Sequence, residues 1–478
     1  MSYKRKKTKI VATLGPAVSS KEMLLDMVAA GVNVFRINFS HADYDDVRQR
    51  IKYIRDINKE HGYNAAILAD LQGPKLRVGV MKDDVVVAPG DEIVFATGKR
   101  FEGTNNRVYM TYDQFPQDTN PGERILLDDG KLIFEVISTN KKDAVKAKVI
   151  QGGPLKSKKG VNLPNTAISQ PALTEKDKKD ALFAIEQEVD WIALSFVRNP
   201  EDLMELEAII SKNSSYKIPI IAKIEKPEAV ENIDKIVAYC DGLMVARGDL
   251  GVEIPAQEVP LIQKQLVLKA KSARIPVIIA TQMMESMIES LTPTRAEVND
   301  VANSVMDGAD AVMLSGETSV GQYPVEVVKK VSDIIKSVEN SDLIHVPQKH
   351  PHIKTKRYIT KSVCYHAAHM ANQINARGIA TLTNSGYTAF QISAWRPKAH
   401  ILVYSSNKRI IPQLNLLWGV RAFYYDRFVS TDETVEDVNK MAMEKGYLEE
   451  GDMVISLAAM PIQEKGMVNT LRVTEVKS

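Results

Sequence analysis

The sequence predicts an α/β protein built on a (β/α)8 TIM barrel, with an inserted β-barrel-like domain and a C-terminal α/β domain. Eight apolar, β-branched runs alternate with helical patterns, a long segment without helical period interrupts them, and a polar segment follows the eighth run. Strands that alternate with amphipathic helices form parallel βαβ units, and eight such units imply a closed barrel. The runs are KIVATLG, VNVFRINFS, AAILADLQ, DWIALSFV, IPIIAKIE, GLMVARGD, IPVIIATQ and ADAVMLSGE.

Local signals indicate where barrel helices begin and end. A polar side chain followed three residues later by an acidic one is typical of a helix start, and proline is favoured in a first turn. We expect starts at Ser19 with Glu22, at Asn199 before Pro200 and at Thr294 with Glu297. Gly31 follows the first helix, where a left-handed cap is favoured.

The interruption after the third strand predicts a second domain at residues 75–170, which leaves residues 1–74 and 171–345 for the barrel. Its short alternating runs DEIVFAT, RILLDDGKLIFEVI and AVKAKVI are separated by turn residues, as in a small β-barrel or sandwich. The polar, proline-bearing HVPQKHPHIKTKRY is typical of a linker. Residues 354–478 then predict a third domain, with ARGIATLTNSG, KAHILVYSS and GDMVISLAA as strands and SVCYHAAHMANQI as a helix.

The composition is that of an ordinary soluble globular protein of 478 residues, with 44% hydrophobic and 26% charged residues. The formal net charge of +2 does not indicate a nucleic-acid or membrane partner. The apolar run after the basic start MSYKRKKTK is too short for a signal peptide or a membrane span. Cys240 and Cys364 show no pairing pattern, which suits a reducing compartment, so we expect a cytoplasmic protein.

Lys223 and Glu225 lie two residues apart at the end of one apolar run, and Asp249 follows the next run. Side chains two apart on a strand share a face, so an ammonium and a carboxylate project together where a second carboxylate arrives. This pattern predicts a divalent-metal site, for Mg²⁺ or Mn²⁺, beside a phosphate-binding cation. The alternative is a solvated edge strand with a weak ion pair; the absence of alternation in IPIIA favours a strand buried on both faces.

Other polar residues follow the remaining strands, at the end of a barrel where active sites form. They are Arg36, Asn38 and Ser40, Asp70, Thr281, and Ser315 with Glu317. Hard oxygen ligands together with the fixed charges of Arg36 and Lys223 favour phosphoryl transfer. The small-residue turn Ala246-Arg247-Gly248-Asp249 would let a carboxylate or phosphate approach the backbone, or it serves only as a tight turn. Neither a Walker-type loop nor GxGxxG occurs.

The chain resembles the pyruvate kinase family over nearly its whole length. The resemblance rests on KIVATLGPA, FRINFSH, KKGVNLP, LTEKDKKD, AKIEKPEAV, MVARGDLGVEIP, ATQMMESM, PTRAEVNDVANSVMDGADAVMLSGETSVGQYP and NSGYTA, in that order. It implies a barrel domain, an inserted domain that closes as a lid, and a C-terminal effector domain. It also implies phosphoryl transfer from phosphoenolpyruvate to Mg-ADP, giving pyruvate and ATP in the last step of glycolysis, in a homotetramer.

The resemblance also implies roles for individual residues. Glu225 and Asp249 match the divalent-metal ligands, Lys223 the lysine that stabilises the moving phosphoryl group, and Arg36 the phosphate-binding arginine. Thr281 matches the threonine near the substrate carboxylate and the enolate protonation path, and Ser315 resembles a member of the same relay. The positions around the nucleotide are Pro16, Asn38, His41, Arg77 and Lys159.

One motif departs from the family pattern. Many members carry T-K-G-P-E where this chain has Leu71-Gln72-Gly73-Pro74-Lys75, and members that need K⁺ surround it with residues like Asn38, Ser40 and Asp70. An ammonium at Lys75 could supply the charge that K⁺ brings, so we expect K⁺ not to be required. The alternative is a solvated lysine at the hinge of the inserted domain.

A candidate effector site follows the run IATL, at Thr383, Asn384, Ser385, Gly386, Tyr387 and Thr388. Hydroxyls and free N–H groups at a helix start suit an anionic phosphometabolite, and a plain helix cap is the alternative. Two other readings of the whole chain stay open here: a metal-dependent aldolase or lyase acting on pyruvate-like enolates, and a metabolite-sensing protein without catalysis.

Overall fold

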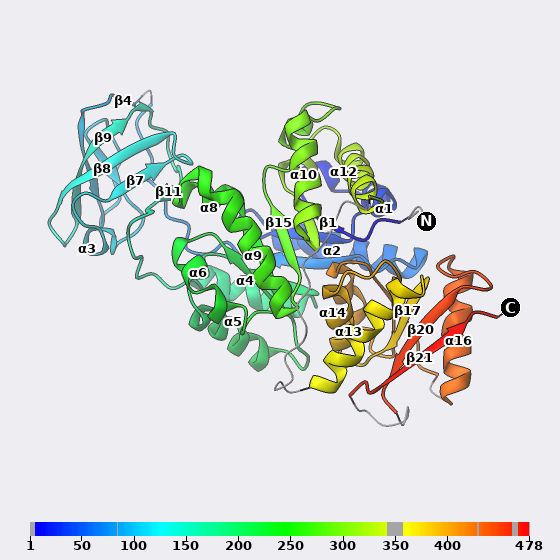
Figure 1. Ribbon diagram of the computed structural model, residues 1–478. Coiled ribbons are helices and arrows are strands. Elements are labelled where there is room, and N and C mark those ends of the chain that lie inside the picture. Colours follow the sequence, from blue (N-terminus) through cyan, green and yellow to red (C-terminus); the bar gives the residue numbers. More distant parts are fainter. Residues whose placement is uncertain (1–4, 84, 342–356, 428–429, 461–466, 478) are drawn as a thin grey trace.

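A computed structural model describes residues 5–83, 85–341, 357–427, 430–460 and 467–477. These residues form a barrel, a β-rich inserted domain (residues 75–170, called the lid below) that projects from one end of it, and a C-terminal α/β domain packed near the other end (Figure 1). Most of the predicted linker, residues 345–356, lies outside the described part. Among the described helices, none has the length and apolar character needed to cross a membrane.

The barrel is closed and entirely parallel, in the order β1-β16-β15-β14-β13-β12-β3-β2. All eight predicted strands are confirmed. Their bounds are β1 Lys9–Thr13, β2 Val34–Asn38, β3 Ala66–Asp70, β12 Trp191–Leu194, β13 Ile220–Ile224, β14 Gly242–Ala246, β15 Val277–Ala280 and β16 Ala311–Leu314. Seven of them are buried along their whole length, and β2 is partly exposed only at Arg36 and Asn38, because helices cover the outside while packed side chains fill the inside.

Helices surround the barrel as the sequence pattern predicts. They are α1 Lys21–Ala30, α2 Tyr44–His61, α4 Glu175–Glu186, α5 Pro200–Asn213, α6 Pro227–Glu231, α7 Ile233–Ile236, α8 Arg247–Glu253, α9 Val259–Ala273, α10 Arg295–Asp307, α11 Gly316–Ser319 and α12 Pro324–Glu339. Asn199 caps α5, and Thr294 with Glu297 forms the expected capping box of α10. The start of α1 was predicted wrongly, because Ser20 and not Ser19 accepts the capping hydrogen bond, from the N–H of Met23.

The inserted segment folds into a curled six-stranded sheet in the order β11-β7-β8-β9-β5-β6, beside the short pair β10-β4. Its elements are β4 Val86–Val87, β5 Glu92–Ala96, β6 Arg107–Tyr109, α3 Phe115–Asp118, β7 Arg124–Leu127, β8 Leu132–Thr139, β9 Ala144–Gln151, β10 Gly153–Pro154 and β11 Val161–Asn162. The alternating runs place apolar side chains in a separate core around Phe95, Phe115 and Phe134. The lid is therefore a folded unit with its own interior.

The C-terminal domain is a five-stranded sheet in the order β19-β18-β17-β20-β21, parallel except for β21. Its elements are α13 Tyr358–Gln373, β17 Gly378–Leu382, α14 Tyr387–Ala394, β18 His400–Ser405, α15 Ile410–Gln413, β19 Val420–Tyr424, α16 Thr431–Glu444, β20 Met453–Ala458 and β21 Thr470–Glu475. This domain contacts the barrel where the strands begin: the buried Trp191 donates its indole N–H to the backbone oxygen of Gln413, at 3.0 Å. The carboxyl ends of the strands, where the predicted site lies, remain on the side of the lid.

Candidate active site

Lys223 is the centre of a buried cluster of charges at the carboxyl ends of the barrel strands. Its ammonium lies 3.1 Å from an oxygen of Asp70 and 2.9 Å from an oxygen of Glu225, and it donates to the hydroxyl of Ser195 at 2.6 Å. Because β3, β12 and β13 are neighbours in the barrel, these side chains converge from three strand ends. The alternative of a solvated ion pair is thus wrong, since Asp70 and Glu225 are each 1% exposed.

Arg36 joins this cluster from the end of β2. Its Nε lies 2.6 Å from Asp70, and its Nη1 donates to the hydroxyl of Thr13 at 3.1 Å. Burial opposes the ionisation of Asp70, but the charges of Arg36 and Lys223 outweigh burial and hold the pKa of this carboxyl below its ordinary value. The same balance acts on Lys223: burial disfavours its charge, yet Asp70 and Glu225 raise its pKa above the ordinary range. The cluster therefore keeps Lys223 charged at neutral pH.

Glu225 and Asp249 form the candidate metal site. Burial and the nearby charge of Asp249 raise the pKa of Glu225, against the opposing effect of Lys223. One oxygen of Glu225 accepts the N–H of Phe196 at 2.8 Å. Asp249 is partly exposed and makes no hydrogen bond or ion pair with a described residue.

This donor set fits Mg²⁺. Within the described residues, no group of three histidine, cysteine or acidic side chains could hold a metal ion by itself. Mg²⁺ characteristically takes one or two protein carboxylates and completes its shell with water and substrate phosphate oxygens. Asp249 has no bonding partner among the described residues, and its charge together with burial disfavours ionisation of the neighbouring Glu225. A bound dication would stabilise both carboxylates in their charged form.

The segment Ala246–Asp249 is not an isolated turn, as the sequence suggested, but the end of β14 and the first turn of α8. The N–H of Gly248 donates to the hydroxyl of Thr281 at 2.8 Å, and that hydroxyl donates to the backbone oxygen of Ala280 at 2.6 Å. Thr281 has a positive φ of 72°. A non-glycine residue in this region is uncommon and its strain is often found at functional sites.

Arg247 points away from the charge cluster. Its guanidinium contacts Asp300 at 2.6 Å and the backbone oxygen of Thr281 at 2.7 Å, so it fixes the loop after β15. Ser315 follows β16, and its N–H donates to the buried carboxylate of Glu317 at 2.7 Å. Burial raises the pKa of Glu317. No hydrogen bond between the described hydroxyls of Thr281 and Ser315 connects the predicted relay.

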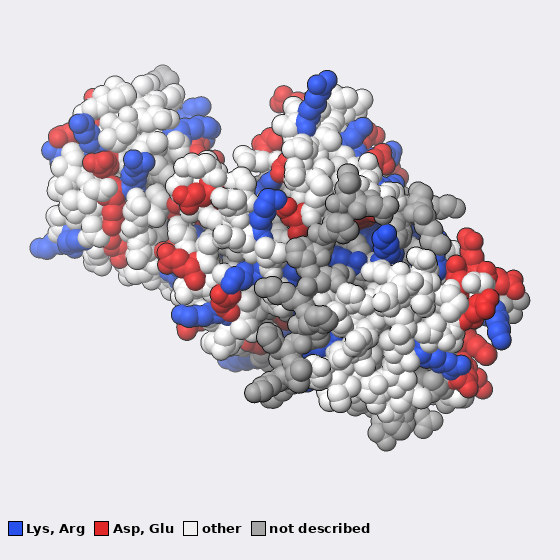
Figure 2. Space-filling model, viewed as in Figure 1, with Lys and Arg blue, Asp and Glu red and all other residues white. Residues whose placement is uncertain are grey.

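The predicted nucleotide residues fall into two groups, one on the barrel and one on the lid, and Figure 2 shows a hollow between the lid and the part of the barrel that carries α10. Pro16, Asn38 and His41 belong to the barrel, where the side-chain oxygen of Asn38 accepts the N–H of Ser40 at 3.1 Å. Arg77 and Lys159 belong to the lid: Arg77 donates to the backbone oxygen of Lys158 at 2.9 Å, and Lys159 lies 2.8 Å from Asp128. No hydrogen bond or ion pair among the described residues joins the two groups.

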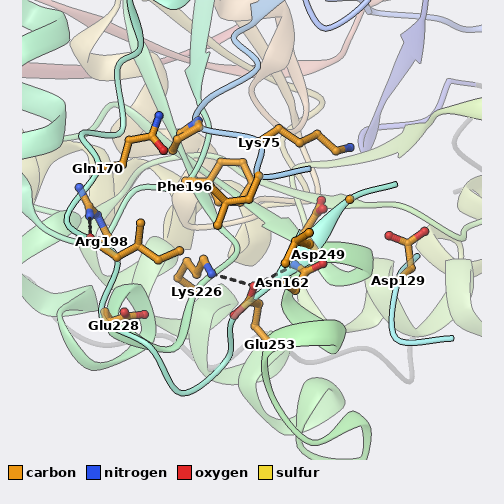
Figure 3. A pocket seen from close by; sticks show the side chains of 15 residues that line it. Lys75, Asp129, Asn162, Gln170, Phe196, Arg198, Lys226, Glu228, Asp249 and Glu253 are labelled. Carbon is orange, nitrogen blue, oxygen red and sulfur yellow. Dashed lines mark hydrogen bonds and ion pairs between the residues drawn. The ribbon is translucent and has the colours of Figure 1, made fainter. Parts of the chain in front are cut away.

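Lys75 lines a pocket between the lid and the barrel, together with Asp129 and Asp249 (Figure 3). Its side chain is exposed and makes no hydrogen bond or ion pair with a described residue. Asp70, which the sequence associated with it, is already paired with Arg36 and Lys223. The structure thus brings Arg36, Asp70 and Lys223 together but shows no contact of Lys75 with Asn38, Ser40 or Asp70.

The candidate effector segment forms the turn between β17 and α14. The hydroxyl of Thr383 accepts the N–H of Gly386, whose φ is 79°, and Asn384 and Ser385 are exposed. The hydroxyl of Thr388 is buried and accepts a hydrogen bond from Thr381 at 3.1 Å, so this hydroxyl does not lie on the exposed part of the turn. Tyr387 is partly buried, with the guanidinium of Arg357 4.5 Å from its ring centre.

Sequence reasoning missed Ser195 and Phe196, which follow β12 and bind Lys223 and Glu225. The rule that polar groups after barrel strands form the site would have found Ser195. Phe196 has a positive φ of 56° and its N–H donates to Glu225, but no sequence pattern predicts this backbone conformation. Lys226 and Glu253, which form a buried ion pair of 2.7 Å beside the site, were also missed.

Comparisons with known proteins agree with this geometry. The protein family described as "Pyruvate kinase, barrel domain" matches residues 5–328, and "Pyruvate kinase, alpha/beta domain" matches residues 361–474. The chain is 43% identical to the pyruvate kinase of Corynebacterium glutamicum, over 98% of this chain and 97% of that protein. It is 42% identical to that of Geobacillus stearothermophilus, over 98% and 80% of the two chains. The crystal structure of a pyruvate kinase from Cryptosporidium parvum superposes with a TM-score of 0.91 at 32% identity, covering 98% of this chain and 96% of the other.

Proposed function

We propose, because this chain belongs to the pyruvate kinase family, that its reaction takes place at the charge cluster around Lys223. The chain is a phosphotransferase that moves the phosphoryl group of phosphoenolpyruvate to ADP and forms pyruvate and ATP. The observation that carries the site assignment is the ammonium of Lys223, held between Asp70 and Glu225 with Arg36 alongside. Phosphoryl transfer needs fixed positive charge more than covalent chemistry, and this cluster provides it.

Arg36 and Lys223 are the proposed contacts of the moving phosphoryl group. Their pairing with Asp70 fixes the two cations before substrate arrives, so little reorganisation is needed during the reaction. Thr281 is the proposed residue near the substrate carboxylate and the enolate, with the N–H of Gly248 aligned by its hydroxyl. Ala246, Arg247 and Ser315 complete this side of the proposed site through the backbone of β14, the loop after β15 and the end of β16.

Glu225 and Asp249 are the proposed ligands of Mg²⁺, for which Mn²⁺ substitutes. A dication held by these two carboxylates would supply charge neutralisation for the transferred phosphoryl group. The protein's part is to hold the two carboxylates at the end of β13 and the start of α8, where the N–H of Phe196 orients Glu225. The nucleotide is proposed to lie between Pro16, Asn38 and His41 on the barrel and Arg77 and Lys159 on the lid.

The enzyme is further proposed to work without K⁺. Lys75 supports this proposal, because its exposed ammonium has no hydrogen-bond or ion-pair partner among the described residues and lines the same pocket as Asp249. A tethered cation in this pocket supplies positive charge with no binding equilibrium.

Three further properties are proposed from family membership. We propose a cytoplasmic glycolytic enzyme, assembled as a homotetramer, and allosteric control by a phosphometabolite at residues 383–387. Exposed apolar side chains on the barrel support an assembly: Leu261 is 63% exposed, Leu268 47% and Val320 62%. Light scattering coupled to size-exclusion chromatography measures the mass, and a monomer would contradict the tetramer.

The metal assignment is tested by a coupled pyruvate assay with phosphoenolpyruvate and ADP while Mg²⁺ is titrated. Glu225→Gln and Asp249→Asn each keep one oxygen and lose the charge, so both should require more Mg²⁺, and excess Mn²⁺ should partly rescue them. Glu231→Gln, an exposed position at the end of α6, is the matched control and should behave like the parent. Unchanged Mg²⁺ dependence in both site variants would show that the ligands were wrongly assigned.

A further inference from the structure

We propose that Glu253 and Lys226 are positioning residues that set the spacing of the two metal ligands, and that Asn162 connects this pair to the lid. This inference rests on the proposed metal site at Glu225 and Asp249. No hydrogen bond or ion pair among the described residues joins Glu253 or Lys226 to Arg36 or Lys223, so their role is distinct from that of the charge cluster.

The three side chains meet at one oxygen atom. Oε1 of Glu253 accepts from the ammonium of Lys226 at 2.7 Å and from the side-chain amide of Asn162 at 2.8 Å (Figure 3). The side chains of Lys226 and Glu253 are 7% and 1% exposed. The other oxygen of Glu253 is buried and has no hydrogen-bond partner among the described residues. The carboxylate therefore depends on Lys226 and Asn162 to offset its burial.

The sequence positions of Lys226 and Glu253 decide which parts of the barrel their ion pair holds together. Lys226 directly follows the metal ligand Glu225, and Glu253 lies one helical turn after the metal ligand Asp249 in α8. The ion pair thus links the same two segments that carry the two carboxylates. If the link loosens, α8 is free to shift relative to the end of β13, and the separation of the metal ligands changes with it.

Asn162 extends the link into the lid. It lies in β11, which pairs with β7 of the lid sheet, whereas Glu253 and Lys226 belong to the barrel. Among the described contacts, Arg198 donating to the backbone oxygen of Ile168 at 2.6 Å is a second bond at this junction, but it does not reach α8. A movement of the lid would therefore be transmitted through Asn162 to α8, the helix that carries Asp249.

The first experiment measures Mn²⁺ binding to the substrate-free enzyme by electron paramagnetic resonance. Glu253→Gln should bind Mn²⁺ about tenfold more weakly, as is typical when a supporting contact behind a metal ligand is lost. Lys226→Arg keeps the ion pair and should stay close to the parent, whereas Lys226→Met should resemble Glu253→Gln. Affinity within twofold of the parent for both Glu253→Gln and Lys226→Met would overturn the proposal.

Reference variants separate this inference from the metal assignment. If Glu225→Gln and Asp249→Asn bind Mn²⁺ like the parent, the metal site is wrong and the positioning role is refuted with it. If those two lose Mn²⁺ while the Glu253 and Lys226 variants keep it, the positioning role alone is refuted.

The second experiment concerns the lid and leaves no buried charge unpaired. Asn162→Ala should accelerate amide hydrogen exchange in β11 and also in residues 248–254, and should raise the KM for ADP more than it lowers kcat. Asn165→Ala, an exposed neighbour in the same segment, is the control. Faster exchange confined to β11, with α8 unchanged, would refute the connection to the lid.

Discussion

Replacing Lys223 by methionine should abolish most of the activity and also weaken the fold. Methionine keeps the length of the side chain but removes the only cation that contacts both Asp70 and Glu225 among the described residues. Loss of one preorganised donor to the transition state costs about 2.7–4 kcal/mol of barrier, which corresponds to a fall in kcat of about 10²–10³. A full charge should cost at least as much.

The same substitution leaves Asp70 paired with Arg36, and it leaves the buried Glu225 without a cation partner among the described residues. Breaking a buried ion pair by removing one partner costs about 3–5 kcal/mol of stability. The free energy of unfolding should therefore fall together with the activity, and the two effects must be separated. Lys223→Met combined with Glu225→Gln also removes the charge of the carboxylate that has lost its cation, so it should regain much of the stability without regaining turnover.

The assay is pyruvate formation from phosphoenolpyruvate and ADP at saturating Mg²⁺, with urea unfolding followed by circular dichroism. The pKa of Lys223 is raised in the folded protein, so its charge is fully present below the ordinary lysine pKa and is lost only as pH rises through the higher pKa of the folded state. The ratio of parent to variant activity should thus be constant from about pH 6 to pH 9. Near-normal turnover of Lys223→Met, or recovery of turnover in the double variant, would refute the role assigned to this ammonium.

Three further predictions concern other residues of the proposed sites. Parent activity should persist when K⁺ is replaced by tetramethylammonium at constant ionic strength, and Lys75→Glu should introduce K⁺ dependence; strong K⁺ activation of the parent would contradict the assignment of Lys75. Thr281→Ala should lower kcat about 10²-fold or more, because it removes a group proposed to handle a proton. Thr281→Ser keeps the hydroxyl that accepts the N–H of Gly248, so it should retain most of the activity. An equal loss of activity in both variants would indicate that the strained backbone at residue 281, and not the hydroxyl, matters. Ser385→Ala should weaken the activation or inhibition of the enzyme by sugar phosphates or AMP. Thr388→Ala loses a buried hydrogen bond, so it should lower the free energy of unfolding by about 1 kcal/mol and leave that response intact. An unchanged response in Ser385→Ala would indicate that the segment is a plain helix cap.

Much of the barrel and its site could be predicted from sequence because both follow simple geometric rules. A strand covered on both faces leaves an unbroken apolar run, and this signal identified all eight strands. The carboxyl ends of parallel strands meet at one end of a barrel, which is why Arg36, Asp70 and Lys223 could be expected to converge.

The features that were missed depend on information that no short pattern contains. Ser19 and Ser20 are equally good capping residues by type, and the backbone conformation decides between them. The start of α8 resembles a turn because Gly248 and Asp249 are common in turns. The contact between Asn162 and Glu253 joins positions far apart in the chain, and neither residue signals the other.

The insertion of a separately packed lid also has a consequence for how the barrel assembles. Strand β3 pairs with β12, so Leu68 must find Trp191 across the entire inserted segment. Closing a flexible loop of that length carries an entropic cost that grows by about 0.6 kcal/mol with each doubling of the chain between the ends. A lid that forms its own core first replaces most of this loop by a compact body whose two ends lie near each other, at Leu76 and Val161, where backbone hydrogen bonds join them. We therefore expect the lid to fold first and to bring the two parts of the barrel together before the barrel closes.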